Sequence, residues 1–297
     1  MYGRYPIVRR GTFGGFAVSI LMSLFLGLVQ GITEFLPVSS SGHLAIFQNI
    51  FNLAYEEDGH LFFEVLLHMG TLISIIVVYR KELRAMLSDG LDFLRRRADF
   101  DSDEPIVLKP SARALLFVIV GTLPMFLVLF FASAVTRLFF NMAFIGFALM
   151  ITGGLVYVSD RIVVKGNKTE KTMTMADALI IGFAQAAAVL PGLSRSGTTI
   201  AVGLARGLKG SFAVRFSLLL SIPAVVGSMI IHLYEAIRSG LGLGLFFIYL
   251  PGFIVAAVVG FFAIQFIRRM MKKGKFGSFA FYCWGAGLLT IILSLIF

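Results

Sequence analysis

The chain has 297 residues, of which 58% are hydrophobic and only 14% are charged, with a mean hydropathy of +0.91. Soluble domains carry about 25% charged residues, so this composition excludes an ordinary soluble protein and a disordered chain. The net charge of +10 comes from basic residues grouped between apolar segments, which is typical of loops that face anionic lipid headgroups rather than of nucleic-acid binding. We therefore expect an all-α integral membrane protein surrounded by membrane lipids, with no nucleic-acid partner.

The first predicted element is a broken helical hairpin. Arg4, Arg9 and Arg10 precede an apolar run without a small-residue cleavage site after it, so a retained membrane segment is favoured over a signal peptide. The apolar residues 11–33 then meet Glu34, Pro37 and three serines before a second apolar stretch, residues 44–55. Non-helical backbone at membrane depth needs protein or a water-filled cavity around it. The break therefore predicts a re-entrant hairpin beside a polar cavity.

Three predicted spans follow this hairpin, because a bilayer is crossed by about 20 helical residues. They are residues 61–79, 114–135 and 138–158. Residues 80–113 hold eight Lys and Arg residues, and we expect them to form a solvated loop.

A second broken hairpin and three more spans complete the chain. Apolar residues 178–190 meet Pro191 and a polar cluster, and the short stretch 199–205 follows. The last three spans are residues 216–234, 241–267 and 276–297.

The two halves resemble each other in sequence. Residues 27–43 (GLVQGITEFLPVSSSGH) match residues 182–198 (GFAQAAAVLPGLSRSGT) with one gap. The chain is thus predicted to be a single membrane domain, 1–297, built from repeats at about 13–158 and 176–297. Each repeat holds a hairpin and three spans, and an odd number of spans inverts the second repeat, as in many transporters.

The charges of the loops predict an orientation. The basic segments 80–113, 160–177 and 268–275 fall on one side, which the positive-inside rule makes cytoplasmic. Both termini then lie outside, although the three N-terminal arginines do not fit this orientation.

Ionisable residues at membrane depth are costly and mark candidate functional sites. Gln30 and Glu34 are four residues apart and share a helix face, as do Glu64 and His68. Ser39, Ser40 and Ser41 precede His43, which offers a nucleophile and a base within one turn, although a serine here could equally cap the following helix.

Arg195 faces Ser40 in the register of the repeat. A guanidinium suits phosphate oxygens, and the turn PGLSRSGTT around it is typical of an anion cradle at a helix N-terminus. The alternative is an arginine that pairs with Glu34 for packing alone. The residues expected to contact the substrate are Gln30, Ser39, Ser41, Gly192, Ser194, Ser196, Thr198 and Thr199.

Three motifs carry a family resemblance. QGITEF at residues 30–35, LPVSSSGH at 36–43 and PGLSRSGTT at 191–199 resemble the bacitracin-resistance type of undecaprenyl-diphosphate phosphatase, and FEVLLHMGTL at 63–72 extends the similarity. The resemblance implies hydrolysis of undecaprenyl diphosphate to the monophosphate and phosphate. It also implies a divalent cation, Mg²⁺ or Ca²⁺, and a plasma-membrane site that opens to the extracytoplasmic side.

The resemblance also implies roles for individual residues. Ser40 is the candidate nucleophile, His43 and Glu34 are the acid–base and metal-associated groups, and Arg195 is the phosphate clamp. Gln30 stands where many members have Glu, and since it cannot act as a base we expect it to donate and accept hydrogen bonds. Direct attack by water and a homodimer remain open, and the rival function is a lipid-phosphate flippase or transporter built on the same repeat.

Overall fold

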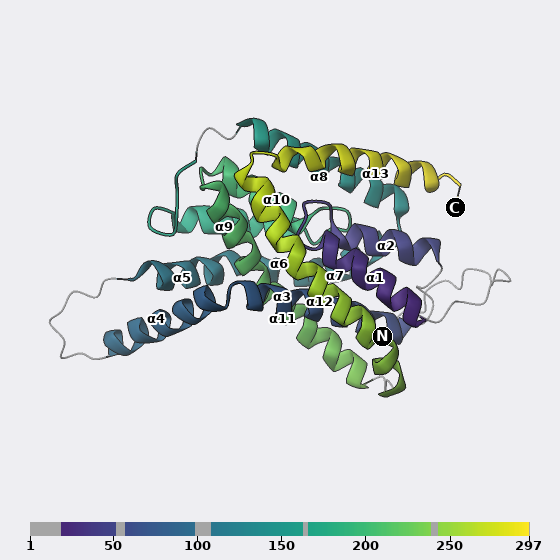
Figure 1. Ribbon diagram of the computed structural model, residues 1–297, viewed down its shortest axis with the longest axis horizontal. Helices are drawn as coiled ribbons and strands as arrows, with labels where there is room; N and C mark the ends of the chain where they lie inside the picture. The colour runs from purple at the N-terminus through teal and green to yellow at the C-terminus, as the bar shows by residue number, and fades with distance from the viewer. Residues whose placement is uncertain (1–18, 52–56, 99–107, 163–165, 239–242, 297) are drawn as a thin grey trace.

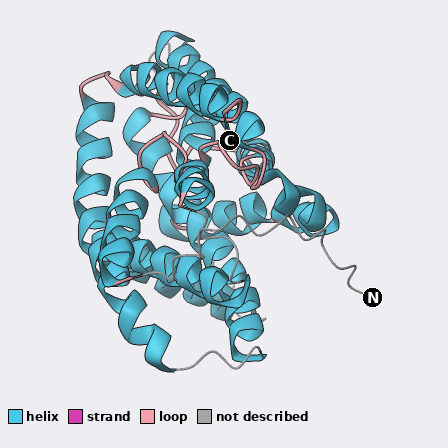
Figure 2. Cartoon of the chain, turned by 90° about the vertical axis from the view of Figure 1, so that its right-hand side faces the viewer, coloured by secondary structure: helices cyan, strands magenta, loops and turns pink. Residues whose placement is uncertain are grey.

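The computed structural model describes residues 19–51, 57–98, 108–162, 166–238 and 243–296. Within these ranges the regular elements are all helical, apart from one isolated bridge between Lys168 and Leu208 (Figures 1 and 2). The all-α prediction is therefore confirmed.

Both predicted hairpins are helix–break–helix units. The first consists of α1 (Ile20–Thr33) and α2 (Ser40–Ile50), and the second of α9 (Met175–Ala187) and α10 (Arg195–Ala205). All four helices are shorter than a bilayer needs. The outer ends of the first predicted hairpin, residues 11–18 and 52–55, lie outside the described residues, and its re-entrant course stays a prediction.

Five of the six predicted spans are helices that are long and apolar enough to cross a bilayer. The sixth, α3 (Glu57–Val78), qualifies only together with α4 (Arg80–Ala98), from which it is bent by 77°. The other spans, with the short helices that belong to them, are α5 (Pro110–Thr122) with α6 (Met125–Val128), η2 (Leu129–Phe131) and α7 (Ala132–Leu138); α8 (Met142–Ile162); α11 (Gly210–Arg238); α12 (Leu243–Lys272); and η3 (Phe276–Ser278) with α13 (Phe279–Leu293).

The expectation of a solvated loop at residues 80–113 is wrong for residues 80–98, which form α4. Leu83, Met86 and Gly90 recur at helical spacing, and the buried Met86 and Gly90 face inward. A Cβ built on Gly90 would lie 2.7 Å from the Leu115 side chain of α5. Because charged residues dominate the composition of this segment, composition alone did not indicate the buried stripe. Figure 1 shows α4 and α5 extending side by side, away from the other helices.

Two close helix contacts relate the halves of the chain. A Cβ built on Gly27 of α1 would lie 2.3 Å from the carbonyl oxygen of Gly252 in α12, and one built on Gly182 of α9 would lie 2.2 Å from that of Gly121 in α5. Gly27 and Gly182 occupy the same position in the sequence repeat. The first helix of each hairpin therefore packs on a span of the opposite half. The repeat and its inversion stay predictions.

Candidate active site

The break of the first hairpin places a buried carboxylate beside a hydroxyl. Glu34 ends α1, and its side chain is only 2% exposed. Ser40 opens α2, and its Oγ donates a hydrogen bond to Glu34 Oε2 at 2.6 Å. Gln30, one turn earlier on α1, donates from Nε2 to the same oxygen at 3.0 Å. The predicted helix face of Gln30 and Glu34 thus forms one side of a polar cluster.

The second hairpin contributes the positive charge. Arg195 is the first residue of α10, and its guanidinium donates to Glu34 Oε1 in an ion pair that joins the two hairpins. His68 of α3 lies nearby, with Nε2 3.8 Å from Glu34 Oε2. Ser40 and Arg195 therefore meet at one carboxylate, as their equivalent positions in the repeat suggested. The Glu34–Arg195 pair of the packing alternative is also present.

The backbone at the first break is strained. Ser39 has a φ of 69°, and it is the one non-glycine residue with positive φ among those described. Such a conformation costs about 1–3 kcal/mol and is concentrated at functional sites. Ser39 also caps α2, because its Oγ accepts from the Gly42 amide at 3.2 Å. Ser39 is therefore the helix cap of the serine triplet, and Ser40 is left to contact Glu34.

His43 is held away from Ser40. Its Nδ1 is 2.7 Å from the carbonyl oxygen of Ser39, which can only accept, so Nδ1 carries a proton. In the neutral ring Nε2 then accepts from the Tyr282 hydroxyl at 2.7 Å. Neither nitrogen bonds to Ser40 in the described part of the chain, so Glu34 is the group placed to take the serine proton.

The serines that were predicted to contact the substrate form hydrogen bonds within and between the two hairpin breaks. Ser41 shares a 3.3 Å hydrogen bond with Ser39, and Ser196 shares one of the same length with Ser194. Ser196 also donates to the carbonyl oxygen of Leu36 at 3.0 Å, which joins the breaks of the two hairpins.

The three remaining residues that were predicted to contact the substrate lie at the second hairpin. Thr199 Oγ1 donates to the Arg195 carbonyl oxygen at 2.7 Å. Thr198 Oγ1 is buried and has no partner among the described residues. Gly192 has a φ of +92°, and a Cβ there would lie 2.5 Å from the carbonyl oxygen of Ile145, so no other residue fits. Substrate contact by these residues stays a prediction.

Comparison with known proteins assigns the chain to a family. Residues 23–289 match the family described as bacitracin resistance protein BacA. The chain belongs to this family. It is 37% identical over 274 residues to the undecaprenyl-diphosphatase of Carboxydothermus hydrogenoformans, covering 91% of this chain and 96% of that protein. It is 36% identical over 290 residues to the undecaprenyl-diphosphatase of Methanosphaera stadtmanae, covering 94% and 99% of the two chains.

Two residues of this BacA-family chain extend the site beyond the sequence motifs. Tyr282 of α13 stacks on His43, with ring centroids 5.7 Å apart and planes at 11°, in addition to bonding it. Thr152 of α8 accepts from the Ser194 amide at 3.0 Å and donates to the Gly192 carbonyl oxygen at 2.9 Å. Each lies in a largely apolar span outside the sequence motifs, and no local pattern marks it.

The oxygens at the centre fit a cation shared with a substrate. The described residues contain no group of three His, Cys, Asp or Glu side chains that could hold a metal alone. However, Gln30 Oε1 is a buried acceptor without a partner in the described chain, and it lies on the helix face of the Glu34 carboxylate. Mg²⁺ prefers oxygen ligands and is commonly bound by one or two carboxylates plus substrate phosphates. The donor set suits such a shared site.

Proposed function

We propose that this protein hydrolyses undecaprenyl diphosphate to undecaprenyl phosphate and inorganic phosphate, which recycles the lipid carrier for cell-wall synthesis. The observation that carries the proposal is the meeting of Ser40 and Arg195 at the Glu34 carboxylate. This arrangement unites a hydroxyl, a base and a phosphate-type cation in the break of a membrane hairpin. Family membership and relatives named undecaprenyl-diphosphatase support the same reaction.

The reaction begins at the Ser40–Glu34 hydrogen bond. Ser40 Oγ forms a bond to the terminal phosphorus while its proton passes to Glu34 Oε2, 2.6 Å away. The bond from that phosphorus to the bridging oxygen breaks, and undecaprenyl phosphate leaves. Water then hydrolyses the phosphoserine, which releases phosphate and restores the hydroxyl. Water activated by Glu34 without a phosphoserine is the alternative within this geometry.

Arg195 changes partner during this reaction. A protonated Glu34 has no negative charge, so its hold on the guanidinium weakens just as negative charge develops on the phosphoryl oxygens. The planar guanidinium can then bind two of those oxygens. Phosphoryl transfer depends mainly on positioning and charge neutralisation, and Arg195 supplies both.

The cation and the location belong to the same proposal. A divalent cation held by the Glu34 carboxylate and Gln30 Oε1 would neutralise diphosphate charge. The site would open to the extracytoplasmic side of the plasma membrane, opposite the basic loops. No observation favours a flippase.

The direct experiment measures phosphate release from undecaprenyl diphosphate by the purified protein in detergent. We expect release by the wild-type protein, and loss of release in Glu34→Gln, which removes the acceptor for the serine proton. Ser88→Ala, which removes an exposed hydroxyl on α4, is the control and should keep full activity. A folded wild-type protein that releases no phosphate with Mg²⁺ or Ca²⁺ present would contradict the proposal.

A further inference from the structure

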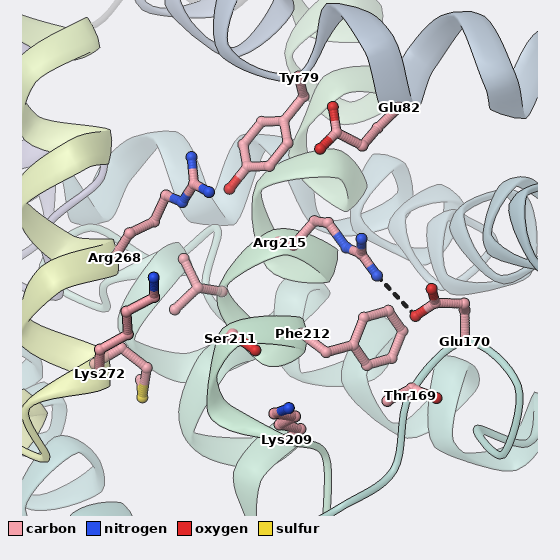
Figure 3. Close-up of a pocket in the computed structure, with 12 residues that line it drawn as sticks. Tyr79, Glu82, Thr169, Glu170, Lys209, Ser211, Phe212, Arg215, Arg268 and Lys272 are labelled. Carbon is pink, nitrogen blue, oxygen red and sulfur yellow. Dashed lines mark hydrogen bonds and ion pairs between the residues drawn. The ribbon is translucent and has the colours of Figure 1, made fainter.

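A polar cavity lies away from the Glu34 centre. Its volume is about 270 Å³, and it is formed where α3 meets α4, by the segment before α9, and by the start of α11 and the end of α12 (Figure 3). None of its lining residues takes part in the Glu34 cluster. It lies among the basic segments of the chain rather than between the two hairpin breaks.

The charge of this cavity is positive. Four basic side chains line it, Lys209, Arg215, Arg268 and Lys272, and two acidic ones, Glu82 and Glu170. Glu170 is neutralised by Arg215, whose guanidinium lies 2.7 Å from its carboxylate. For Lys209, Arg268 and Lys272 there is no ion pair within the described chain. Three cations without an ion pair in the described chain thus line the cavity together with one remaining carboxylate, Glu82.

The hydroxyl of Tyr79 adds a hydrogen-bond donor to this positive lining. Tyr79 is only 2% exposed, and its hydroxyl makes no hydrogen bond to any described residue. The guanidinium of Arg268 lies over its ring, 5.8 Å from the centroid. Figure 3 shows the hydroxyl directed into the cavity beside Arg268. The hydroxyl atom itself opens onto the cavity, where an anion would accept a hydrogen bond from it.

We propose that this cavity binds a phosphate group, supplied either by an anionic phospholipid headgroup or by free inorganic phosphate. A tetrahedral oxyanion can accept from the phenol, an ammonium and a guanidinium at once, and charge-assisted bonds to arginine suit it best. Ser211 on the first turn of α11 adds a hydroxyl at a helix N-terminus. The site is independent of the reaction at Glu34 and would lie on the opposite, basic face of the protein.

The test compares matched pairs of variants at the end of α12 and the residue after it. Arg268→Ala and Lys272→Ala each remove a lining charge, whereas Arg269→Ala and Lys273→Ala remove the same charge from exposed neighbours outside the cavity. Binding of inorganic phosphate is measured by calorimetry in detergent at constant ionic strength. Lipid binding is measured by the melting temperature in phosphatidylcholine nanodiscs with and without phosphatidylglycerol. Phosphate that binds at the Glu34 centre contributes equally to all four variants, so only the difference within each pair counts.

We expect each lining variant to weaken phosphate binding about tenfold, or to abolish the stabilisation by phosphatidylglycerol, while its neighbour changes either by less than about twofold. A response to free phosphate alone identifies the ion as the ligand, and a response to phosphatidylglycerol alone identifies the headgroup. Tyr79→Phe keeps the ring under Arg268 and serves if an arginine variant fails to fold; it should weaken the same response. Equal behaviour of both members of each pair, in both arms, overturns the proposal. Hydrolysis of undecaprenyl diphosphate by the same samples shows separately whether the Glu34 centre works.

Discussion

One carboxylate organises the active site at the scale of single residues. Glu34 accepts from Gln30 and Ser40 through one oxygen and from Arg195 through the other. A buried ion pair of this kind is weak evidence for stability, because desolvation offsets its attraction. In the proposed mechanism, one proton transfer to this carboxylate changes both Ser40, the proposed nucleophile, and Arg195, the proposed phosphate clamp.

Replacing Ser40 should therefore be far more damaging than replacing Ser41. Ser40→Ala removes the hydroxyl that contacts Glu34, and we expect kcat to fall by about 1,000-fold or more. Ser41→Ala loses only its hydrogen bond to Ser39 and should reduce kcat by less than about tenfold. The measurement is phosphate release together with the melting temperature of each variant. Equal, mild losses in both variants would remove Ser40 from the nucleophilic role.

Arg195 can be tested apart from its ion pair. Arg195→Lys retains a positive charge for Glu34 but loses the planar fork, so we expect normal folding and a kcat about 100-fold lower. Arg195→Ala leaves the carboxylate without its cation and should lower the melting temperature as well. If the lysine variant turns over like the wild type, the arginine has only a structural role.

Tyr282 should matter through His43, because the imidazole bonds to the Ser39 carbonyl oxygen and so holds the turn that presents Ser40. Tyr282→Phe keeps the stacked ring and removes the hydrogen bond to Nε2, so we expect about a fivefold loss of activity, corresponding to one ordinary hydrogen bond. Tyr157→Phe on α8, which removes a hydroxyl that makes no hydrogen bond within the described chain, is the control. Identical activity of the two variants would show that the tyrosine does not position the imidazole.

The site residues that lie in local motifs were predictable from the sequence. Which of them contact one another was predictable only in part. Gln30 and Glu34 share a helix face because of their spacing, and the repeat placed Ser40 opposite Arg195. Ser40 and His43 are close in sequence, which suggested a hydrogen-bonded pair that the structure does not form. The strained turn at Ser39 directs the His43 imidazole to the Ser39 carbonyl oxygen and to Tyr282 instead. Such a contact depends on a helix more than 200 residues away, which no local pattern encodes.

At the scale of elements, the second hairpin is closed at its base by Asp177. This side chain, near the start of α9, is fully buried and binds Lys168 at 2.9 Å and Arg206 at 2.8 Å. It also accepts from the Thr174 amide at 3.1 Å in a capping box. Arg206 follows α10, so one carboxylate ties the beginning of the hairpin to its end.

The pH dependence of this tie follows from the pKa of Asp177. Burial alone would raise this pKa, but hydrogen bonds from Lys168, Thr174 and Arg206 outweigh burial and lower the pKa to about 2. A lowered pKa means that the charged form stabilises the fold above the unfolded value near 3.8 and that this stabilisation is lost as the pH falls through about 2. We expect Asp177→Asn to cost about 2 kcal/mol at pH 7, with roughly half of the difference from wild type gone at pH 3.

The measurement is thermal unfolding of both proteins in detergent between pH 7 and pH 3. Asp92→Asn, at an exposed carboxylate on α4, is the matched control and should change the melting temperature little. A difference between Asp177→Asn and wild type that stays constant over this pH range would contradict the assignment.

The helix α4 could not be predicted from the sequence, for a physical reason. Spans were predictable because lipid requires about 20 apolar residues in succession. An amphipathic helix at the surface needs only a narrow buried stripe, and in α4 three inward residues are outnumbered by charged ones. The sharp bend between α3 and α4 lies at Tyr79. No proline stands there to indicate a bend, so the bend was likewise not predictable from composition.

At the scale of the whole molecule, the orientation can be tested by labelling. In a Cys283→Ser background, a cysteine added after residue 297 should react with an impermeant reagent from outside, whereas Arg95→Cys should react only after the membrane is permeabilised. The reason is the positive-inside rule applied to the basic segments. The reverse pattern would overturn the orientation, and with it the extracytoplasmic opening of the site.

The packing of the first hairpin on the end of the chain has a consequence for synthesis. Ser23 of α1 bonds to Tyr249, 226 residues later, and His43 bonds to Tyr282, 239 residues later. A ribosome delivers α1 and α2 first, so Ser40 and Glu34 are made long before the helices that pack on this hairpin exist. The nascent protein therefore lacks these contacts until its last helix has been inserted, and a chain released early by a stop codon in α13 would carry the three sequence motifs without the helix that contacts His43.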